Sequence, residues 1–254
     1  MLKTLSPGMQ VIMFILLVIF CGIMGSAVLS IALRITVSQE DLMLINVQDP
    51  RFVMTLNLFN HVFSFLVAFL LFLRLTRERF TDMVHMQPIK LKPLLITVGL
   101  FIACYLSFPL FDIINGTLRS ILPYSIIEGD ILLNEKFEAL YVQSDAIQFI
   151  FSLVISAMLP AIFEELVFRG FLIKKMLQSG MSTYGAIIMS STIFALIHMQ
   201  PLNFLAIFVF GLVLGFVYMK FRNLKYAMIL HFLINGVQIT MGYLEGSGLP
   251  YLDY

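Results

Sequence analysis

The sequence predicts an all-α fold, a polytopic membrane bundle of about seven transmembrane helices, and two observations carry this prediction. Of the 254 residues, 60% are hydrophobic and only 12% are charged, whereas soluble domains carry roughly 25% charged residues. Seven apolar runs approach or exceed the roughly 20 residues that a helix needs to cross the hydrocarbon core. These runs are 9–33, 56–73, 91–111, 146–172, 183–200, 202–219 and 225–243. A water-soluble globule is therefore excluded, and the formal net charge of +1 argues against nucleic acid as a partner.

The first three runs have general membrane character. The first follows Lys3 and is longer than the apolar part of a signal peptide, so we expect a retained anchor. The second carries His61, which we interpret as a hydrogen-bonding group between helices. The third contains no acidic residue. Together with two acidic loops, 34–55 and 112–145, which we expect to cover the surface, these runs form a predicted N-terminal region, 1–145.

The last four runs form a predicted catalytic core, 146–243, followed by a short tail, 244–254. The fourth run contains three charged residues, and the fifth and seventh each contain a histidine. The sixth contains Gly211 and Gly215, a spacing of small residues that lets two helices pack closely within a bundle. The ionisable residues in these apolar runs are the most informative part of the sequence.

Lys and Arg are unevenly divided between the two ends of these runs. With a cytoplasmic N-terminus, twelve cations fall on the cytoplasmic side and four on the outer side. The twelve are Lys3, Arg74, Arg77, Arg79, Lys90, Lys92, Arg169, Lys174, Lys175, Lys220, Arg222 and Lys225. Because cytoplasmic loops retain Lys and Arg more often, we predict an integral membrane protein with its N-terminus in the cytoplasm.

The fourth run places Glu164, Glu165 and Arg169 among apolar residues. Each charge costs about 2.5–3.5 kcal/mol at mid-bilayer on insertion scales, so all three require partners. Glu165 and Arg169 are spaced i,i+4 with the carboxylate first, which favours an ion pair within the helix. Glu164 points about 100° away and needs a proton, a water-filled cavity or a partner from another helix. Pro160 removes a helical hydrogen bond and predicts a kink beside these carboxylates. A purely structural cluster is the alternative interpretation.

Three polar residues in later runs are candidate partners for Glu164. His198 ends the fifth run, and His231 and Asn235 lie one turn apart on the same face of the seventh. A buried carboxylate is an effective general base that can take a proton from water and return it to a leaving amine. His198 could hold the same water, while His231 and Asn235 donate to the oxyanion. Glu164, His198 and His231 are also an acceptable ligand set for catalytic zinc, so the residues support both uses.

Three motifs in this core resemble those of the CPBP family, also called Abi, which contains the CAAX-processing intramembrane endopeptidases and their bacteriocin-processing relatives. E-E-x-x-x-R corresponds to Glu164–Arg169, F-x-x-x-H to Phe194–His198, and H-x-x-x-N to His231–Asn235. The resemblance implies that Glu164 and His198 activate a water and that His231 and Asn235 stabilise the oxyanion. It leaves Glu165, Arg169 and Phe194 as supporting residues.

The resemblance implies an intramembrane protease in a bacterial inner membrane that cleaves a peptide or membrane-protein substrate within the lipid bilayer. The family is also described as metalloproteases; we expect a mechanism that requires no cofactor, with zinc as the alternative. Nothing in the sequence points to a prenyl or CAAX ligand. A non-proteolytic scaffold or bacteriocin self-immunity factor is the rival function, and a proton-coupled transporter is a second rival that would require paired broken helices.

Overall fold

The computed structural model describes residues 2–37, 49–141 and 145–247, and over these residues the chain is helical with no strand. The predicted all-α fold class is confirmed. The helices are α1 (Pro7–Thr36), α3 (Pro50–His61), α4 (Ala68–Thr76), α5 (Phe80–Met83), α6 (Leu91–Leu106), α7 (Phe108–Ile121), α8 (Tyr124–Tyr141), α9 (Ala146–Ser152), α10 (Leu159–Glu165), α11 (Ile173–Gln178), α12 (Thr183–Ile197), α13 (Phe204–Phe221) and α14 (Leu224–Gly246). A short 3₁₀ turn, Leu2–Thr4, precedes α1.

Six helical stretches in the described residues are long and apolar enough to cross a membrane. They are Pro7–Thr36, Arg51–Thr76, Leu91–Ile121, Ala146–Gln178, Phe204–Phe221 and Leu224–Gly246. The predicted run 183–200 differs, because its helix α12 has 15 residues and ends at Ile197. At 1.5 Å per residue α12 is about 22 Å long, which is shorter than the hydrocarbon core.

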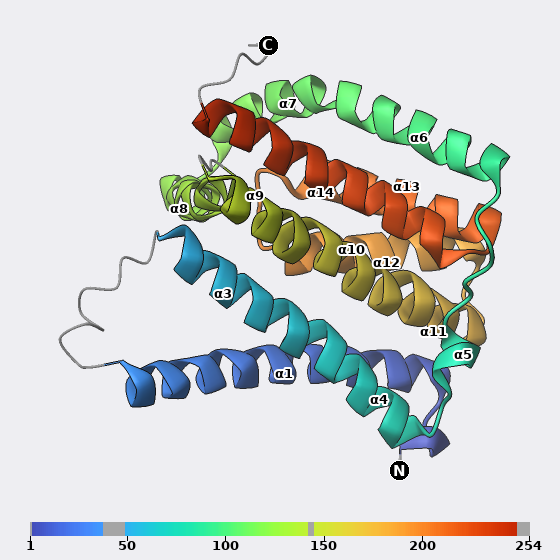
Figure 1. Ribbon diagram of the computed structural model, residues 1–254. Coiled ribbons are helices and arrows are strands. Elements are labelled where there is room, and N and C mark those ends of the chain that lie inside the picture. Colours follow the sequence, from blue (N-terminus) through green and yellow to red (C-terminus); the bar gives the residue numbers. More distant parts are fainter. Residues whose placement is uncertain (1, 38–48, 142–144, 248–254) are drawn as a thin grey trace.

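The bundle has two chemically different ends (Figure 1). At one end α1 begins, α4 and α11 end, and α6 and α14 begin; eleven described Lys and Arg residues belong to this cation-rich end. At the other end, the α8 end, α1 and α14 finish and α3 and α9 begin. Arg169 was predicted among the cytoplasmic cations, and this was wrong, because its side chain is fully buried within the bundle.

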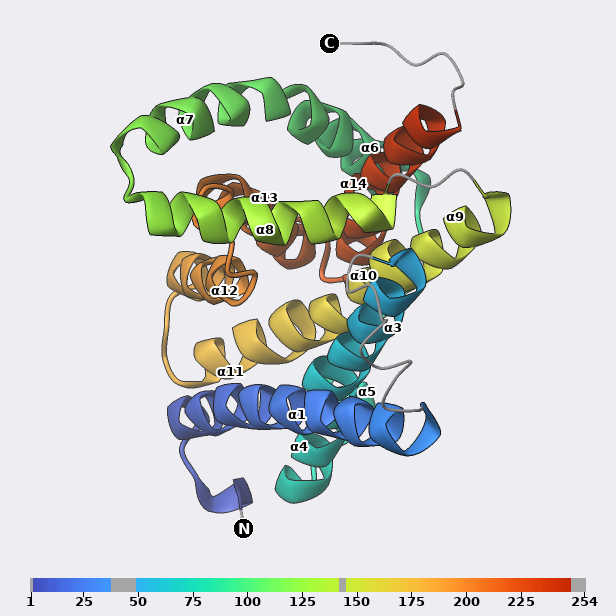
Figure 2. The ribbon, with the colours of Figure 1, turned by 90° about the vertical axis from the view of Figure 1, so that its left-hand side faces the viewer.

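The region 112–145 was predicted to be a surface loop, and this prediction was wrong for the described part. Residues up to Ile121 continue α7, and Tyr124–Tyr141 form α8. Helix α8 is seen end-on in Figure 1 and lengthwise in Figure 2, so it crosses the end of the bundle, where it packs against α14 and α3. The acidic composition concealed these helices, because it lowers the hydropathy without preventing helix formation. In the other predicted loop, residues 38–48 lie outside the described residues.

Close packing of α12 against α13 depends on small residues, as the spacing of Gly211 and Gly215 predicts. A Cβ atom added at Gly211 would lie 3.1 Å from Ser191 Cβ, and one at Gly215 would lie 2.9 Å from Ile187 Cγ2. The two helices run in opposite directions and form a hairpin. Its connecting turn, 198–203, lies inside the bundle rather than at its end (Figure 1).

Three π-helical segments interrupt the long helices: Val62–Val67, Leu153–Met158 and Leu166–Leu172. The first directly follows His61, and the third directly follows Glu165. The second directly precedes α10, which contains Pro160 near its start. π-Helical turns inside α-helices are frequent at functional sites, and here they cluster around the charged residues that the sequence singles out.

Candidate active site

Glu164 lies well inside the longest helical stretch, Ala146–Gln178, and its side chain is buried. The fourth predicted run, 146–172, is therefore six residues too short at its C-terminal end. A helix that ended at residue 172 would leave Glu164 near the membrane surface, whereas the extension to Gln178 places it deeper in the bundle.

Contacts between helices bring His198 and His231 to the level of Glu164. The Ser190 hydroxyl donates to Phe168 O at 3.4 Å. His198 lies eight residues after Ser190, and Pro160 lies eight residues before Phe168, so His198 is level with Pro160, about one turn from Glu164. A Cβ atom at Gly170 would lie 3.7 Å from Leu224 Cδ2. Glu164 is six residues before Gly170 and His231 is seven residues after Leu224, so both lie about 10 Å from that contact.

The predicted ion pair between Glu165 and Arg169 is present. Arg169 Nη1 donates to Glu165 Oε1 at 2.7 Å, and Nη2 donates to Gly211 O at 3.0 Å. The guanidinium also lies 4.7 Å from the centre of the Phe194 ring, a cation–π distance. His231 Nδ1 lies 2.9 Å from the same oxygen of Glu165. Glu165 therefore links Arg169 to His231, which is more than the intrahelical pair that the sequence predicts.

The contacts of the three histidines define where their protons lie. Nδ1 of His61 lies 2.9 Å from Asn57 O, and Nδ1 of His198 lies 2.6 Å from Phe194 O. A carbonyl oxygen only accepts, so each of these nitrogens donates a proton. His231 Nδ1 likewise donates to Glu165 Oε1, the oxygen that also accepts from Arg169. The Nε2 atom of each ring is left for other partners.

His61 is the site residue that the sequence prediction missed. Its Nε2 lies 3.1 Å from Glu164 Oε1. Because Nδ1 already carries a proton, this contact is a hydrogen bond only if one further proton lies between the imidazole and the carboxylate. We expected His61 to bond between helices, which it does, but its partner is Glu164. The i,i+4 spacing of Asn57 and His61 in an apolar run was the available signal.

The second oxygen of Glu164 is free to act. Among the described residues Glu164 Oε2 has no hydrogen-bond partner, although it is buried, and His231 Nε2 lies 3.9 Å away. That separation is too long for a direct hydrogen bond.

Pro160 and Asn235 are connected through Ser156. Pro160 has no N–H to donate to the carbonyl of Ser156 four residues earlier. Asn235 Nδ2 donates to this carbonyl at 3.5 Å, and the Ser156 hydroxyl accepts from Asn57 Nδ2 at 3.1 Å. The amide of Asn235 has two N–H groups, so one remains available to a substrate.

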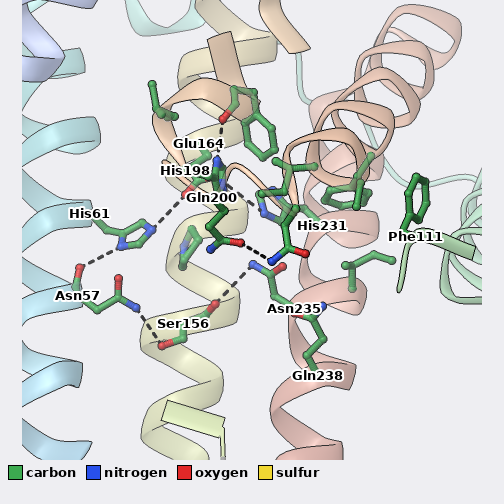
Figure 3. A pocket seen from close by; sticks show the side chains of 18 of the residues that line it. Asn57, His61, Phe111, Ser156, Glu164, His198, Gln200, His231, Asn235 and Gln238 are labelled. Atoms are coloured by element: carbon green, nitrogen blue, oxygen red, sulfur yellow. Dashed lines mark hydrogen bonds and ion pairs between the residues drawn. The ribbon is translucent and has the colours of Figure 1, made fainter. Parts of the chain in front are cut away.

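These side chains line one cavity of about 580 Å³ (Figure 3). Glu164, His198, His231 and Asn235 all contribute to its wall, as does Phe194. Glu165 and Arg169 lie behind the wall. The polar lining also includes Asn57, Asn60, His61, Asp112, Asn115, Ser156, Gln200, Asn203 and Gln238. The structure thus brings together all four residues predicted to be catalytic and adds His61.

The described residues contain no group of three or more His, Cys, Asp or Glu side chains arranged to hold a metal ion. Glu164, His198 and His231, the predicted zinc ligands, line the same cavity without forming such a group. Both uses of these residues, with and without zinc, stay predictions, and we derive no step through a metal.

Residues 146–237 match the family model of the Rce1-like type II CAAX prenyl endopeptidases. The match covers less than half of the chain and confirms the predicted resemblance. It covers the fourth to sixth predicted runs and the first part of the seventh, and it includes Glu164, His198, His231 and Asn235, whereas His61 lies outside it. No curated protein and no solved structure matches the chain. The apolar helices indicate an integral membrane protein, and the Rce1-like match supports a CAAX protease-type function for residues 146–237.

Proposed function

We propose that the protein is an intramembrane endopeptidase that hydrolyses a peptide bond of a membrane or membrane-associated protein with a water activated by Glu164. The observation that carries the proposal is the free, buried Glu164 Oε2 in a polar cavity that His198, His231 and Asn235 also line. The Rce1-like character of this part of the chain supports the same chemistry.

In the proposed mechanism a water lies between Glu164 Oε2 and the histidine Nε2 atoms. Glu164 takes one proton from this water while the water oxygen attacks the carbonyl carbon of the scissile bond. The carbonyl oxygen becomes an oxyanion, which accepts hydrogen bonds from Asn235 Nδ2 and from a protonated His231 Nε2. Glu164 then returns the proton to the leaving amine as the carbon–nitrogen bond breaks.

Two charged neighbours prepare these groups. Glu165, held by Arg169, accepts from His231 Nδ1 and so orients the imidazole with Nε2 on the side of Glu164 Oε2, 3.9 Å away. His61 holds Glu164 Oε1, which leaves Oε2 as the oxygen that faces the water. The mechanism requires no cofactor.

The deciding experiment compares new protein N-termini, identified by mass spectrometry, between cells with the wild type and cells with Glu164→Gln at equal expression. The amide cannot accept the proton, so we expect termini that occur with the wild type alone. The His85→Asn variant is the matched control, because this exposed side chain lies outside the cavity. Identical termini in well-covered samples would overturn the proposal in favour of a scaffold or immunity factor.

We also propose that the protein lies in a bacterial inner membrane with its N-terminus in the cytoplasm. Eleven of the described cations belong to the end of the bundle where α1 begins. Retention of Lys and Arg on the cytoplasmic side supports this orientation.

A further inference from the structure

The cavity extends from Glu164 and His231 toward one end of the bundle. On α10 and α14, Glu164 and His231 are the lining residues nearest the cation-rich end, and the remaining lining residues of these helices lie toward the α8 end. The segment that follows on the cation-rich side, Leu166–Leu172, is entirely buried. The candidate catalytic carboxylate therefore lies at the closed bottom of the cavity.

Three helices carry polar side chains from this bottom toward the α8 end. His231, Asn235 and Gln238 follow one another at helical spacing on α14. Ser156 lies two turns from Glu164, and Asn57 lies one turn from His61 on α3. Gln238 is exposed, as is Asp112 on α7, so these two residues mark the mouth (Figure 3 labels Gln238).

The lining fits an extended polar peptide. Seven lining residues are Asn or Gln, whose amides both donate to and accept from a peptide backbone. From Glu164 to Ser156 is eight residues, or about 12 Å, which is the length of three to four extended residues. The pocket also has an apolar side on α7 and α13, which includes Phe108, Phe111 and Phe210.

The charge of the cavity points to a basic rather than an acidic substrate. Asp112 is at the mouth and Glu164 at the bottom, whereas no lining residue in the described chain is Lys or Arg. Arg169 cannot bind an acidic substrate, because its side chain is fully buried and paired with Glu165. A free C-terminal carboxylate would meet no Lys or Arg in this lining and would have to pass Asp112 at the mouth.

We infer that the cavity admits, from the α8 end, an internal peptide segment that is extended, polar and basic, and that this end faces away from the cytoplasm. Cation-rich ends of membrane bundles face the cytoplasm, and the cavity extends from Glu164 and His231 in the opposite direction, toward the α8 end. The substrate is thus presented on the outer side of the membrane. Its cleavage rests on the proposed function, but the sidedness of the mouth does not.

Sidedness is tested by labelling single cysteines in intact cells with a membrane-impermeant maleimide. Gln238→Cys reports the mouth, and Lys220→Cys, also exposed, reports the cation-rich end; both are placed in a Cys21→Ala, Cys104→Ala background. We expect labelling of Gln238→Cys in intact cells and of Lys220→Cys only after permeabilisation. The reverse pattern would overturn the inference, whatever the outcome for hydrolysis.

Substrate charge is tested with quenched fluorescent peptides that differ only in an Arg or a Glu near the scissile bond. Asp112→Asn should raise the KM of the Arg peptide by about two- to fivefold, the range for one exposed ion pair, and should lower the KM of the Glu peptide, because it removes a like charge. Equal use of both peptides by the wild type would overturn the charge preference. If the wild type cleaves neither peptide, their binding to Glu164→Gln, measured by fluorescence anisotropy, still decides whether the Arg peptide is preferred.

Discussion

One oxygen of the Glu165 carboxylate makes two interactions, and the buried charges depend on this residue. It bonds Arg169 and His231, and Arg169 in turn bonds Gly211 O on α13. An unpaired charge at this depth is costly, so the cluster is stable only as a complete set. The sequence predicts the pair from its i,i+4 spacing, but the contact with His231 spans 66 residues and is set by packing.

Glu165→Gln should destabilise the protein by about 3–5 kcal/mol, because it leaves Arg169 buried without a counter-charge. Thermal unfolding in detergent measures this loss. The Glu165→Leu, Arg169→Met double variant removes both charges and should recover most of the stability, while hydrolysis stays impaired because His231 has lost its acceptor. A double variant as unstable as the single one would contradict this account.

His61→Asn should lower kcat about 10- to 100-fold with a KM within twofold of the wild type, since such supporting contacts act on reactivity more than on binding. Steady-state kinetics with a cleaved peptide separate the two constants. His85→Asn is the control and should change neither. An equal rise of KM and fall of kcat/KM in His61→Asn would instead indicate a binding role.

At the scale of the element, the sequence predicts which runs are helical better than where they end. Six of the seven predicted runs correspond to helical stretches of membrane-crossing length, and the exception is α12. The turn after α12 is stabilised by tertiary contacts, such as that between Asn115 Nδ2 and Asn203 Oδ1 at 3.0 Å, which hydropathy does not report. The π-helical segments were likewise invisible to a periodicity of 3.6 residues.

The dependence on tertiary contacts also explains which residues of the candidate site the sequence could predict. Glu164, His198, His231 and Asn235 stand out because polar residues are rare in apolar runs. His61 is one of several polar residues in its run, and only the fold places it 3.1 Å from Glu164.

Pro160 leaves the Ser156 carbonyl free to accept from Asn235, and so links the kink of the long helix to the candidate site. Pro160→Ala restores an N–H that can bond the Ser156 carbonyl, so Asn235 loses this acceptor. We expect an unchanged or higher melting temperature and a kcat reduced several-fold. Pro109, in the first turn of α7 where no helical hydrogen bond is lost, is the matched control, and Pro109→Ala should not alter kcat. Unchanged kcat in Pro160→Ala would show that the kink only serves packing.

Gly211 sets the distance between α12 and α13. A larger side chain would meet Ser191 and push α13 away from Arg169, so Gly211→Leu should destabilise the protein by about 1–3 kcal/mol. Gly99→Leu is the control, because a Cβ there has no neighbour within 4 Å. Equal melting temperatures of the two variants would contradict the packing role of Gly211.

At the scale of the whole molecule, the α12–α13 hairpin makes the predicted orientation of the chain compatible with a helix α12 that is too short to cross the membrane. The hairpin enters and leaves at the cation-rich end, so it adds no net crossing, and the start of α1 and the end of α14 lie at opposite ends of the bundle (Figure 1). The predicted orientation therefore does not depend on whether α12 spans the membrane.

This arrangement predicts the sidedness of reporter fusions. Alkaline phosphatase, which is active only outside the cytoplasm, should be active when fused after Gly246 at the end of α14 and inactive after Arg222, which follows α13. A fluorescent protein that folds only in the cytoplasm should show the reverse pattern. A fusion after Gln200, within the hairpin turn, tests depth: because this turn lies inside the bundle, truncation there should give low phosphatase activity. High activity after Gln200 would show that α12 crosses the membrane in full.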